Sequence, residues 1–243
     1  MESVTVMKTT SSLGYSEFKA MLGEAKRSSD PLWCRFIYRP LSFPIGWLFY
    51  KVGMKANSVS LLSIFLAVTS SLIMVFGSSD GIVLASFLML LVALSDCIDG
   101  NVARARGETG PGGEWMDALS GYTVYALLPL TLGIHMYLHS PYLALPGLWI
   151  IVGAVTSIAN LFLRLIYQKF LSSILGESTQ KGLKGTGSLV SKFSSEMGLV
   201  GWMMPALLVA SITNMLEAYL VVYCFFYLIS AILITIVLVR KVI

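Results

Sequence analysis

Charged residues are scarce in this chain. Of its 243 residues, 12% are Asp, Glu, Lys or Arg, and 56% are hydrophobic. A soluble domain carries about 25% charged residues. This composition excludes a water-soluble globular fold for most of the chain, so we expect its main partner surface to be the lipid bilayer. No nucleic-acid partner is expected.

Cysteine is also scarce, and its spacing carries no motif. The three cysteines are Cys34, Cys97 and Cys224, and no CxxC pair occurs. A disulfide framework and a zinc site are therefore not expected. A cleavable signal peptide is not expected either, because about the first 35 residues are polar and mixed in charge, with no apolar core behind a basic start.

Long apolar runs fill the rest of the sequence. A helix needs about 20 apolar residues to cross the hydrocarbon. The sequence therefore predicts an all-α integral membrane fold with six transmembrane helices, over 58–76, 82–104, 114–137, 142–166, 197–213 and 216–239. It divides the chain into a cytosolic or interfacial N-terminal segment, 1–57, and a six-helix transmembrane domain, 58–243.

The predicted outer loops contain no Lys or Arg. All 17 of these residues fall within 1–57, 104–113, 164–196 and 240–243. Cytosolic loops of membrane proteins are enriched in Lys and Arg. We therefore expect a multi-pass protein whose two termini, and the inner ends of the second and third spans, are cytosolic.

The N-terminal segment has two interfacial candidates. Residues 15–27 look like an amphipathic helix, and residues 41–54 are apolar but too short to span. Basic residues flank both and would meet anionic headgroups. Simple topological anchoring explains the same pattern.

Three carboxylates lie where apolar sequence is expected. Asp96 and Asp99 end the second predicted span, and Asp117 lies early in the third. An ionisable residue inside a span costs about 2.5–3.5 kcal/mol, so such residues suggest function. Two residues three apart share one helix face, and the short 105–113 connection brings the third carboxylate alongside. Repelling carboxylates need cations, and all-oxygen ligation favours Mg²⁺ or Mn²⁺.

Small and basic residues surround these carboxylates. Gly100, Ala103 and Gly113 allow a ligand to approach the backbone closely. Arg104 and Arg106 add fixed cations. Metal, arginine and an open surface together suit a diphosphate.

The order of these residues resembles a known signature. The pattern reads Asp96-x2-Asp99-Gly100-x2-Ala103-Arg104-x8-Gly113-x3-Asp117. It resembles the motif of the CDP-alcohol phosphotransferase (CDP-alcohol phosphatidyltransferase) family, as do the six predicted spans, the interfacial helix and residues 55–60 at the start of the first span.

The resemblance implies roles for these residues. Asp96, Asp99 and Asp117 would bind Mg²⁺ or Mn²⁺. The CDP pocket would be lined by Asn57, Gly100, Ala103, Arg104 and Gly113. Members of the family move a substituted phosphoryl group from a CDP-linked donor, such as CDP-diacylglycerol or a CDP-alcohol, to an acceptor, with release of CMP. Such enzymes are commonly homodimers.

The family pattern ends with a fourth Asp, the expected general base, and here that position is Gly121. Four explanations stay open. Glu114, one turn before Asp117, could substitute. An acceptor that is already anionic needs no base. The protein could bind a CDP ligand or lipid without turnover. The base could be another group, such as Ser120, a water or a residue of another span.

The acceptor side is less marked in the sequence. Arg164 follows the fourth span, and we assign it, together with Arg106, to acceptor binding; Lys169, Lys181, Lys184 and Lys192 lie nearby in the sequence. Topological positive charge explains these cations equally well. The sequence thus predicts a membrane transferase of phospholipid synthesis, with a catalytically impaired binding protein as the alternative. A transporter is disfavoured, because the polar residues lie on one membrane side.

Overall fold

The computed structural model describes residues 13–139, 147–174 and 195–242. The regular elements in these ranges are helices: α1 Tyr15–Ala20, α2 Glu24–Ser29, η1 Cys34–Tyr38, α3 Arg39–Lys51, α4 Ala56–Phe76, α5 Gly81–Arg106, α6 Pro111–His139, α7 Gly147–Ile174, η2 Leu199–Met203, α10 Met204–Ile212 and α11 Leu216–Val242. The two η elements are π-helical. The all-α prediction is confirmed for these ranges.

Four of these helices are long and apolar enough to cross a membrane: Ala56–Phe76, Gly81–Arg106, Gly147–Ser173 and Leu216–Lys241. The chain is therefore an integral membrane protein. Helix α6 has the length to span but contains Pro129 and polar side chains, and the stretch Leu199–Ile212 is apolar but short. The six-span count stays a prediction.

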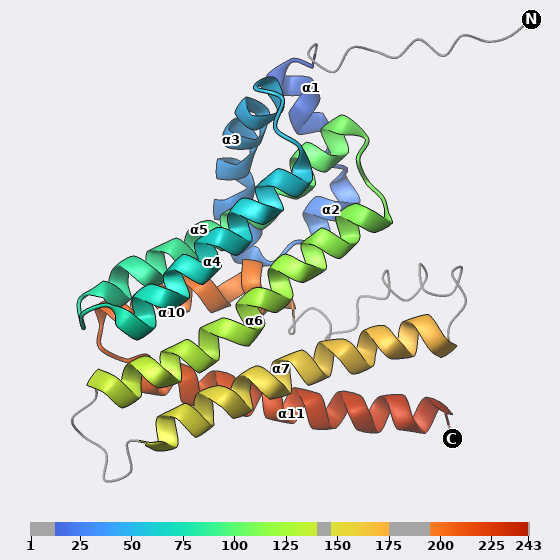
Figure 1. Ribbon diagram of the computed structural model, residues 1–243. Coiled ribbons are helices and arrows are strands. Elements are labelled where there is room, and N and C mark those ends of the chain that lie inside the picture. The colour runs from blue at the N-terminus through green and yellow to red at the C-terminus, as the bar shows by residue number, and fades with distance from the viewer. Residues whose placement is uncertain (1–12, 140–146, 175–194, 243) are drawn as a thin grey trace, which may run out of the picture.

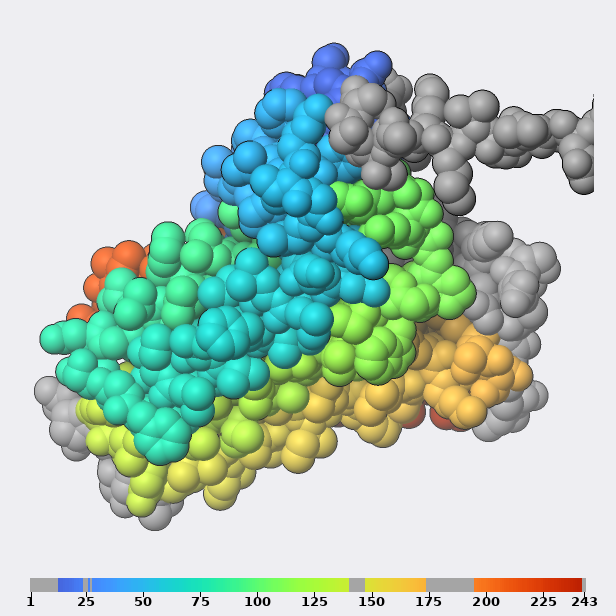
Figure 2. All heavy atoms as spheres, turned by 45° about the horizontal axis from the view of Figure 1, so that its top comes forward, coloured from blue at the N-terminus to red at the C-terminus, as the bar shows by residue number. Residues whose placement is uncertain are grey.

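The helices pack in a chain of neighbours (Figure 1). Helices α4 and α5 form an antiparallel pair, α6 crosses α4 and packs on α7, and α7 packs on α11. Helix α10 lies against α5, and α3 lies against α5 from another side. In the space-filling view, the surface of α4 runs directly beside that of α6 (Figure 2).

Small residues let α6 and α7 cross closely. A Cβ atom on Gly133 would collide with the carbonyl oxygen of Trp149, and one on Gly153 would collide with the carbonyl oxygen of Pro129. The Ser157 hydroxyl donates across the same pair to the Ala126 carbonyl, at 2.9 Å. In a bilayer, the hydrophobic effect does not drive helices together, so close backbone packing and hydrogen bonds between the helices stabilise this crossing.

The N-terminal segment differs from its prediction. The single helix predicted over 15–27 is wrong: α1 ends at Ala20 and α2 begins at Glu24. Gly23 has extended backbone angles and forms the N-cap of α2, so the helix cannot continue through it. The apolar stretch 41–54 lies mostly within one helix, α3, although it contains Pro44.

This segment is packed against the bundle. Phe18, Leu22, Phe43 and Tyr50 form a small core of their own, while Tyr38, in η1, joins the main core. The Cys34 and Cys97 sulfurs, from η1 and α5, lie 3.4 Å apart. Residues 14–51 therefore continue the structure beside α5.

The connection between α5 and α6 is shorter than predicted. Gly107 has a left-handed backbone (φ 68°) and ends α5, and α6 already begins at Pro111. Positive φ favours glycine at this position. The tight turn joins α5 and α6 at the end that carries the carboxylates, while α4 packs against both helices. The fourth predicted span is seen from Gly147 onward, and its start lies outside the described residues.

Candidate active site

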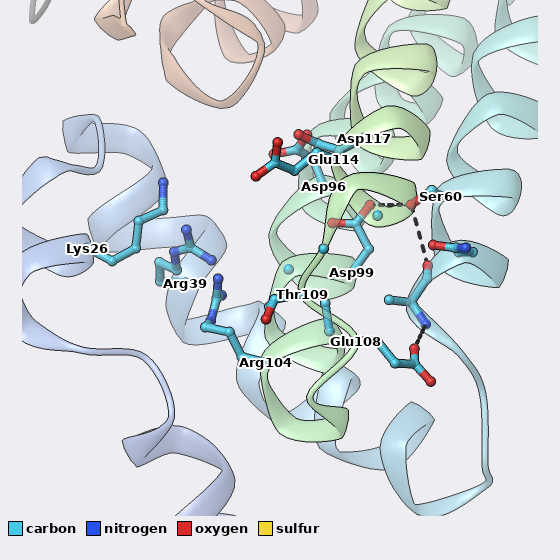
Figure 3. Close-up of a pocket in the computed structure, with 16 residues that line it drawn as sticks. Lys26, Arg39, Ser60, Asp96, Asp99, Arg104, Glu108, Thr109, Glu114 and Asp117 are labelled. Carbon is cyan, nitrogen blue, oxygen red and sulfur yellow. Dashed lines mark hydrogen bonds between the residues drawn. The ribbon is translucent and has the colours of Figure 1, made fainter. Parts of the chain in front are cut away.

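Four carboxylates from two helices face one cavity. Asp96 and Asp99 come from the C-terminal half of α5, and Glu114 and Asp117 come from the first turns of α6. All four line a cavity of about 380 Å³ (Figure 3). The i, i+3 spacing within each helix places each pair on one face. The turn at 107–110 then points the two faces toward each other.

These carboxylates fall into two groups. The Asp99 carboxylate accepts a hydrogen bond from the Ser60 hydroxyl of α4, at 2.7 Å, and is 6% exposed. The Asp96 and Asp117 side chains lie together, beside Glu114 (Figure 3). The structure thus brings together the residues predicted to bind metal, together with the candidate base.

The predicted donor residues line the same cavity: Asn57, Gly100, Ala103, Arg104 and Gly113. A Cβ on Gly100 would lie 3.5 Å from the guanidinium nitrogens of Arg104, so glycine leaves room for that side chain against the helix. Arg104 is held by Asn101, whose Oδ1 accepts from Nη2 at 2.7 Å.

Seven further residues line this cavity, and none was assigned to the site from sequence: Lys26, Arg39, Ala56, Ser60, Glu108, Thr109 and Gly110. The Glu108 carboxylate accepts from the Ala56 amide, at 3.3 Å, and so ties the α5–α6 turn to the start of α4. The basic residues of the N-terminal segment were visible in the sequence. Their pattern, however, is the same for a membrane anchor, so the sequence did not assign them to the site.

A second cavity, of about 670 Å³, adjoins the first. It shares Asp96, Glu114 and Asp117 with the first cavity and opens toward α7 and the residues before η2. Its other lining residues are Ala118, Gly121, Tyr122, Tyr125, Arg164, Tyr167, Gln168, Ser195, Gly198, Leu199 and Val200. Gly121 therefore faces the second cavity.

Arg164 is fixed inside this second cavity. Its Nε donates to the Asn160 Oδ1 at 3.0 Å, and its guanidinium lies 3.6 Å from the centre of the Tyr125 ring. The Tyr125 hydroxyl in turn accepts from the Leu199 amide, at 3.3 Å. This chain of contacts holds one cation at a set place in an otherwise tyrosine-rich wall.

Arg106 is placed elsewhere. Its Nη2 donates to the Tyr50 carbonyl at 3.0 Å, and its guanidinium lies over the Tyr50 ring, away from both cavities. The structure therefore unites Arg164, but not Arg106, with the carboxylates. Lys169 is exposed, and Lys181, Lys184 and Lys192 lie outside the described residues.

The chemistry of the carboxylates fits a hard divalent cation. Within the described ranges, no group of three His, Cys, Asp or Glu side chains is arranged to hold a metal ion by itself. Mg²⁺ is commonly bound by one or two carboxylates together with substrate phosphates. Asp96 and Asp117, which both line the cavity, match that manner of binding; metal ligation stays a prediction.

Fold and site together define a class: an all-helical membrane protein with carboxylates and fixed cations around a cavity at one end of its long helices. The profile of the CDP-alcohol phosphatidyltransferase family matches residues 54–223. The chain belongs to this family, whose members are phosphotransferases of phospholipid synthesis. A search of curated proteins gave no match.

Proposed function

We propose that the protein transfers a substituted phosphoryl group from a CDP-linked donor, CDP-diacylglycerol or a CDP-alcohol, to an alcohol or anionic acceptor, and releases CMP. One observation carries this proposal: two cavities meet at Asp96, Glu114 and Asp117. A two-substrate transfer needs two binding spaces that share one reacting point.

The donor is assigned to the first cavity. Its diphosphate lies between the carboxylates and Arg104, and Asn57, Gly100, Ala103 and Gly113 allow close approach of the nucleotide. Asp96, Asp99 and Asp117 would hold Mg²⁺ or Mn²⁺ only together with the phosphates of the donor, because the three do not form a metal site by themselves. A divalent ion there would neutralise charge on the diphosphate and on the leaving CMP.

The acceptor is assigned to the second cavity, where Arg164 would orient a negatively charged group. The acceptor oxygen attacks the distal phosphorus, a new P–O bond forms, and the P–O bond to CMP breaks. An alcohol gives up its proton in this step. Glu114 lines both cavities, so its carboxylate is placed to take that proton.

The Glu114→Gln variant tests the base. General base catalysis is worth about 10²–10⁴-fold, so CMP release to an alcohol acceptor should fall within that range, while CDP affinity stays near that of the wild type. Unchanged CMP release would remove Glu114 from the role and favour an anionic acceptor.

A second candidate, a binding protein without turnover, is favoured by Gly121. A Cβ at this position would meet its nearest neighbour, Tyr125 Cε2, at an ordinary 3.6 Å, so packing does not require glycine here. This candidate predicts CDP binding by calorimetry with no CMP formed from any donor.

Cytosolic termini, six spans and a homodimer complete the proposed assembly.

A further inference from the structure

The N-terminal segment contributes two cations to the donor cavity. Lys26 comes from α2 and Arg39 is the first residue of α3, and both line the cavity beside the family motif. Both lie before residue 54, outside the stretch that matches the family. The family motif therefore does not account for them.

Arg39 is held in a fixed orientation. Its Nε and Nη2 donate to the two carboxylate oxygens of Asp30, at 2.6 and 3.1 Å. Its Nη1 points toward the Cys97 carbonyl and the Asn101 Oδ1, each at 3.4 Å. The residue is 8% exposed. The Arg39 side chain is already ordered by these contacts. It therefore loses little further conformational freedom when it binds a ligand.

The charges around Arg39 do not cancel. Lys26 and Arg39 share one carboxylate, because the Lys26 Nζ also lies 3.4 Å from Asp30. Arg104, from α5, adds a third cation to the same side of the cavity (Figure 3). The three side chains and Asp30 therefore carry a net charge of about two positive units at neutral pH.

The carboxylates lie across the cavity from these cations (Figure 3). A ligand that fits between the two sides must have negative charge for the cations, and oxygens that share metal ions with the carboxylates. A diphosphate satisfies both demands, and guanidinium groups match phosphate oxygens in geometry. A neutral nucleoside satisfies neither demand.

We infer that Arg39, with Lys26 and Arg104, forms a cationic wall that binds the diphosphate of the donor, and that Asp30 positions Arg39 for this contact. This inference rests on the proposed function, because it takes the first cavity as the donor site. It extends the substrate site into the N-terminal segment.

The test compares ligands with and without phosphate. Binding of radiolabelled CDP to the full-length protein in nanodiscs is measured with Mg²⁺, and cytidine is measured by competition. Arg39→Gln should weaken CDP binding about 10- to 100-fold, the range for hydrogen bonds to charged groups. Its effect on cytidine should be less than about twofold, because cytidine does not reach the wall.

Two further variants separate binding from folding. Arg35→Gln is the control: Arg35 is exposed and its Nη2 donates to the Ser28 carbonyl at 2.7 Å, so it holds the same turn without lining the cavity. It should leave CDP binding unchanged. Lys26→Gln removes a half-exposed cation of the wall and should weaken CDP binding about 2- to 10-fold even if Arg39→Gln fails to fold.

Two results would overturn the inference while the proposed function stands. One is wild-type affinity for CDP in both Arg39→Gln and Lys26→Gln. The other is an equal loss of CDP and cytidine binding in Arg39→Gln, which indicates a structural role. A wild-type protein that binds no CDP would overturn the proposed function and this inference together.

Discussion

At the scale of single residues, Gly121 stands where the family resemblance predicts a fourth acid, and a substitution there tests the need for one. Gly121 lines the second cavity, and a side chain there meets Tyr125 at ordinary contact distance. If an alcohol is the acceptor, Gly121→Asp should raise CMP release, by up to about 10²-fold if Glu114 is a poor base. A matched Gly121→Asn variant, which cannot take a proton, should not. Equal rates for wild type and Gly121→Asp would mean that Glu114 already suffices as the base or that the acceptor is anionic, and the Glu114→Gln variant distinguishes the two.

A buried ion pair gives the N-terminal segment a pH dependence. Burial acts to raise the pKa of Asp30, but hydrogen bonds and charge from Arg39, with Lys26, lower it by more, so the pKa lies below its ordinary value. A carboxyl with a lowered pKa stabilises the fold above its unfolded pKa, about 3.9, and this stabilisation is lost as pH falls through the folded value.

The Asp30→Asn variant measures this contribution. At pH 7 it leaves Arg39 buried without its partner, and we expect a loss of about 3–5 kcal/mol in unfolding free energy. The difference from wild type should shrink below about pH 4. Thermal unfolding in detergent across pH checks it, with the exposed Glu17→Gln as control. A difference that stays constant from pH 7 to pH 3 would contradict the assigned cause.

At the scale of elements, the docking of η1 on α5 can be trapped chemically. The Cys34 and Cys97 sulfurs lie 3.4 Å apart. Their hydrogen bond and the nearby Arg39, against the effect of burial, lower the pKa of Cys34 and favour its thiolate. Diamide, which accepts the two electrons and two protons released, should form a Cys34–Cys97 disulfide detectable by peptide mass spectrometry.

The remaining cysteine supplies the control. Cys224 lies on α11, so Cys224→Ser should leave this crosslink intact, whereas Cys34→Ser should abolish it. Recovery of both thiols unlinked, under conditions that oxidise Cys224, would mean that the N-terminal segment is not docked on α5.

The crossing of α6 and α7 depends on its glycines. Gly153→Ala places a methyl group against the Pro129 carbonyl and should cost about 1–3 kcal/mol, seen as a lower melting temperature. Gly147→Ala, on the same helix, has open space around the added atom and serves as the control. Equal melting temperatures for the two variants would argue against this close crossing.

Local sequence patterns could predict the helices and the motif, but not the part of the cationic wall that comes from the N-terminal segment. Asp96, Asp99 and Asp117 follow from helical spacing and a short turn, both properties of neighbouring residues. Lys26 and Arg39 reach the cavity only because α2 and α3 fold back on α5. Arg106 shows the same limit: it lies two residues after Arg104, so helical rotation directs it to Tyr50 instead.

At the scale of the whole molecule, every Lys and Arg falls in a segment that the sequence predicts to be cytosolic. This distribution predicts that the C-terminus after α11 is cytosolic. An added protease should digest a C-terminal tag in inside-out membrane vesicles and in permeabilised cells, but not in intact cells. Digestion in intact cells would contradict the cytosolic C-terminus.

The central proposal for the whole molecule is metal-dependent transfer. CMP release from CDP-diacylglycerol should be measured with the purified protein in lipid vesicles, with polyol, amino-alcohol and phosphorylated acceptors, with Mg²⁺ or with EDTA. We predict that CMP appears with Mg²⁺ and falls more than about 100-fold with EDTA or in Asp99→Asn. CMP release that survives both changes would contradict the carboxylate cluster as the catalytic centre.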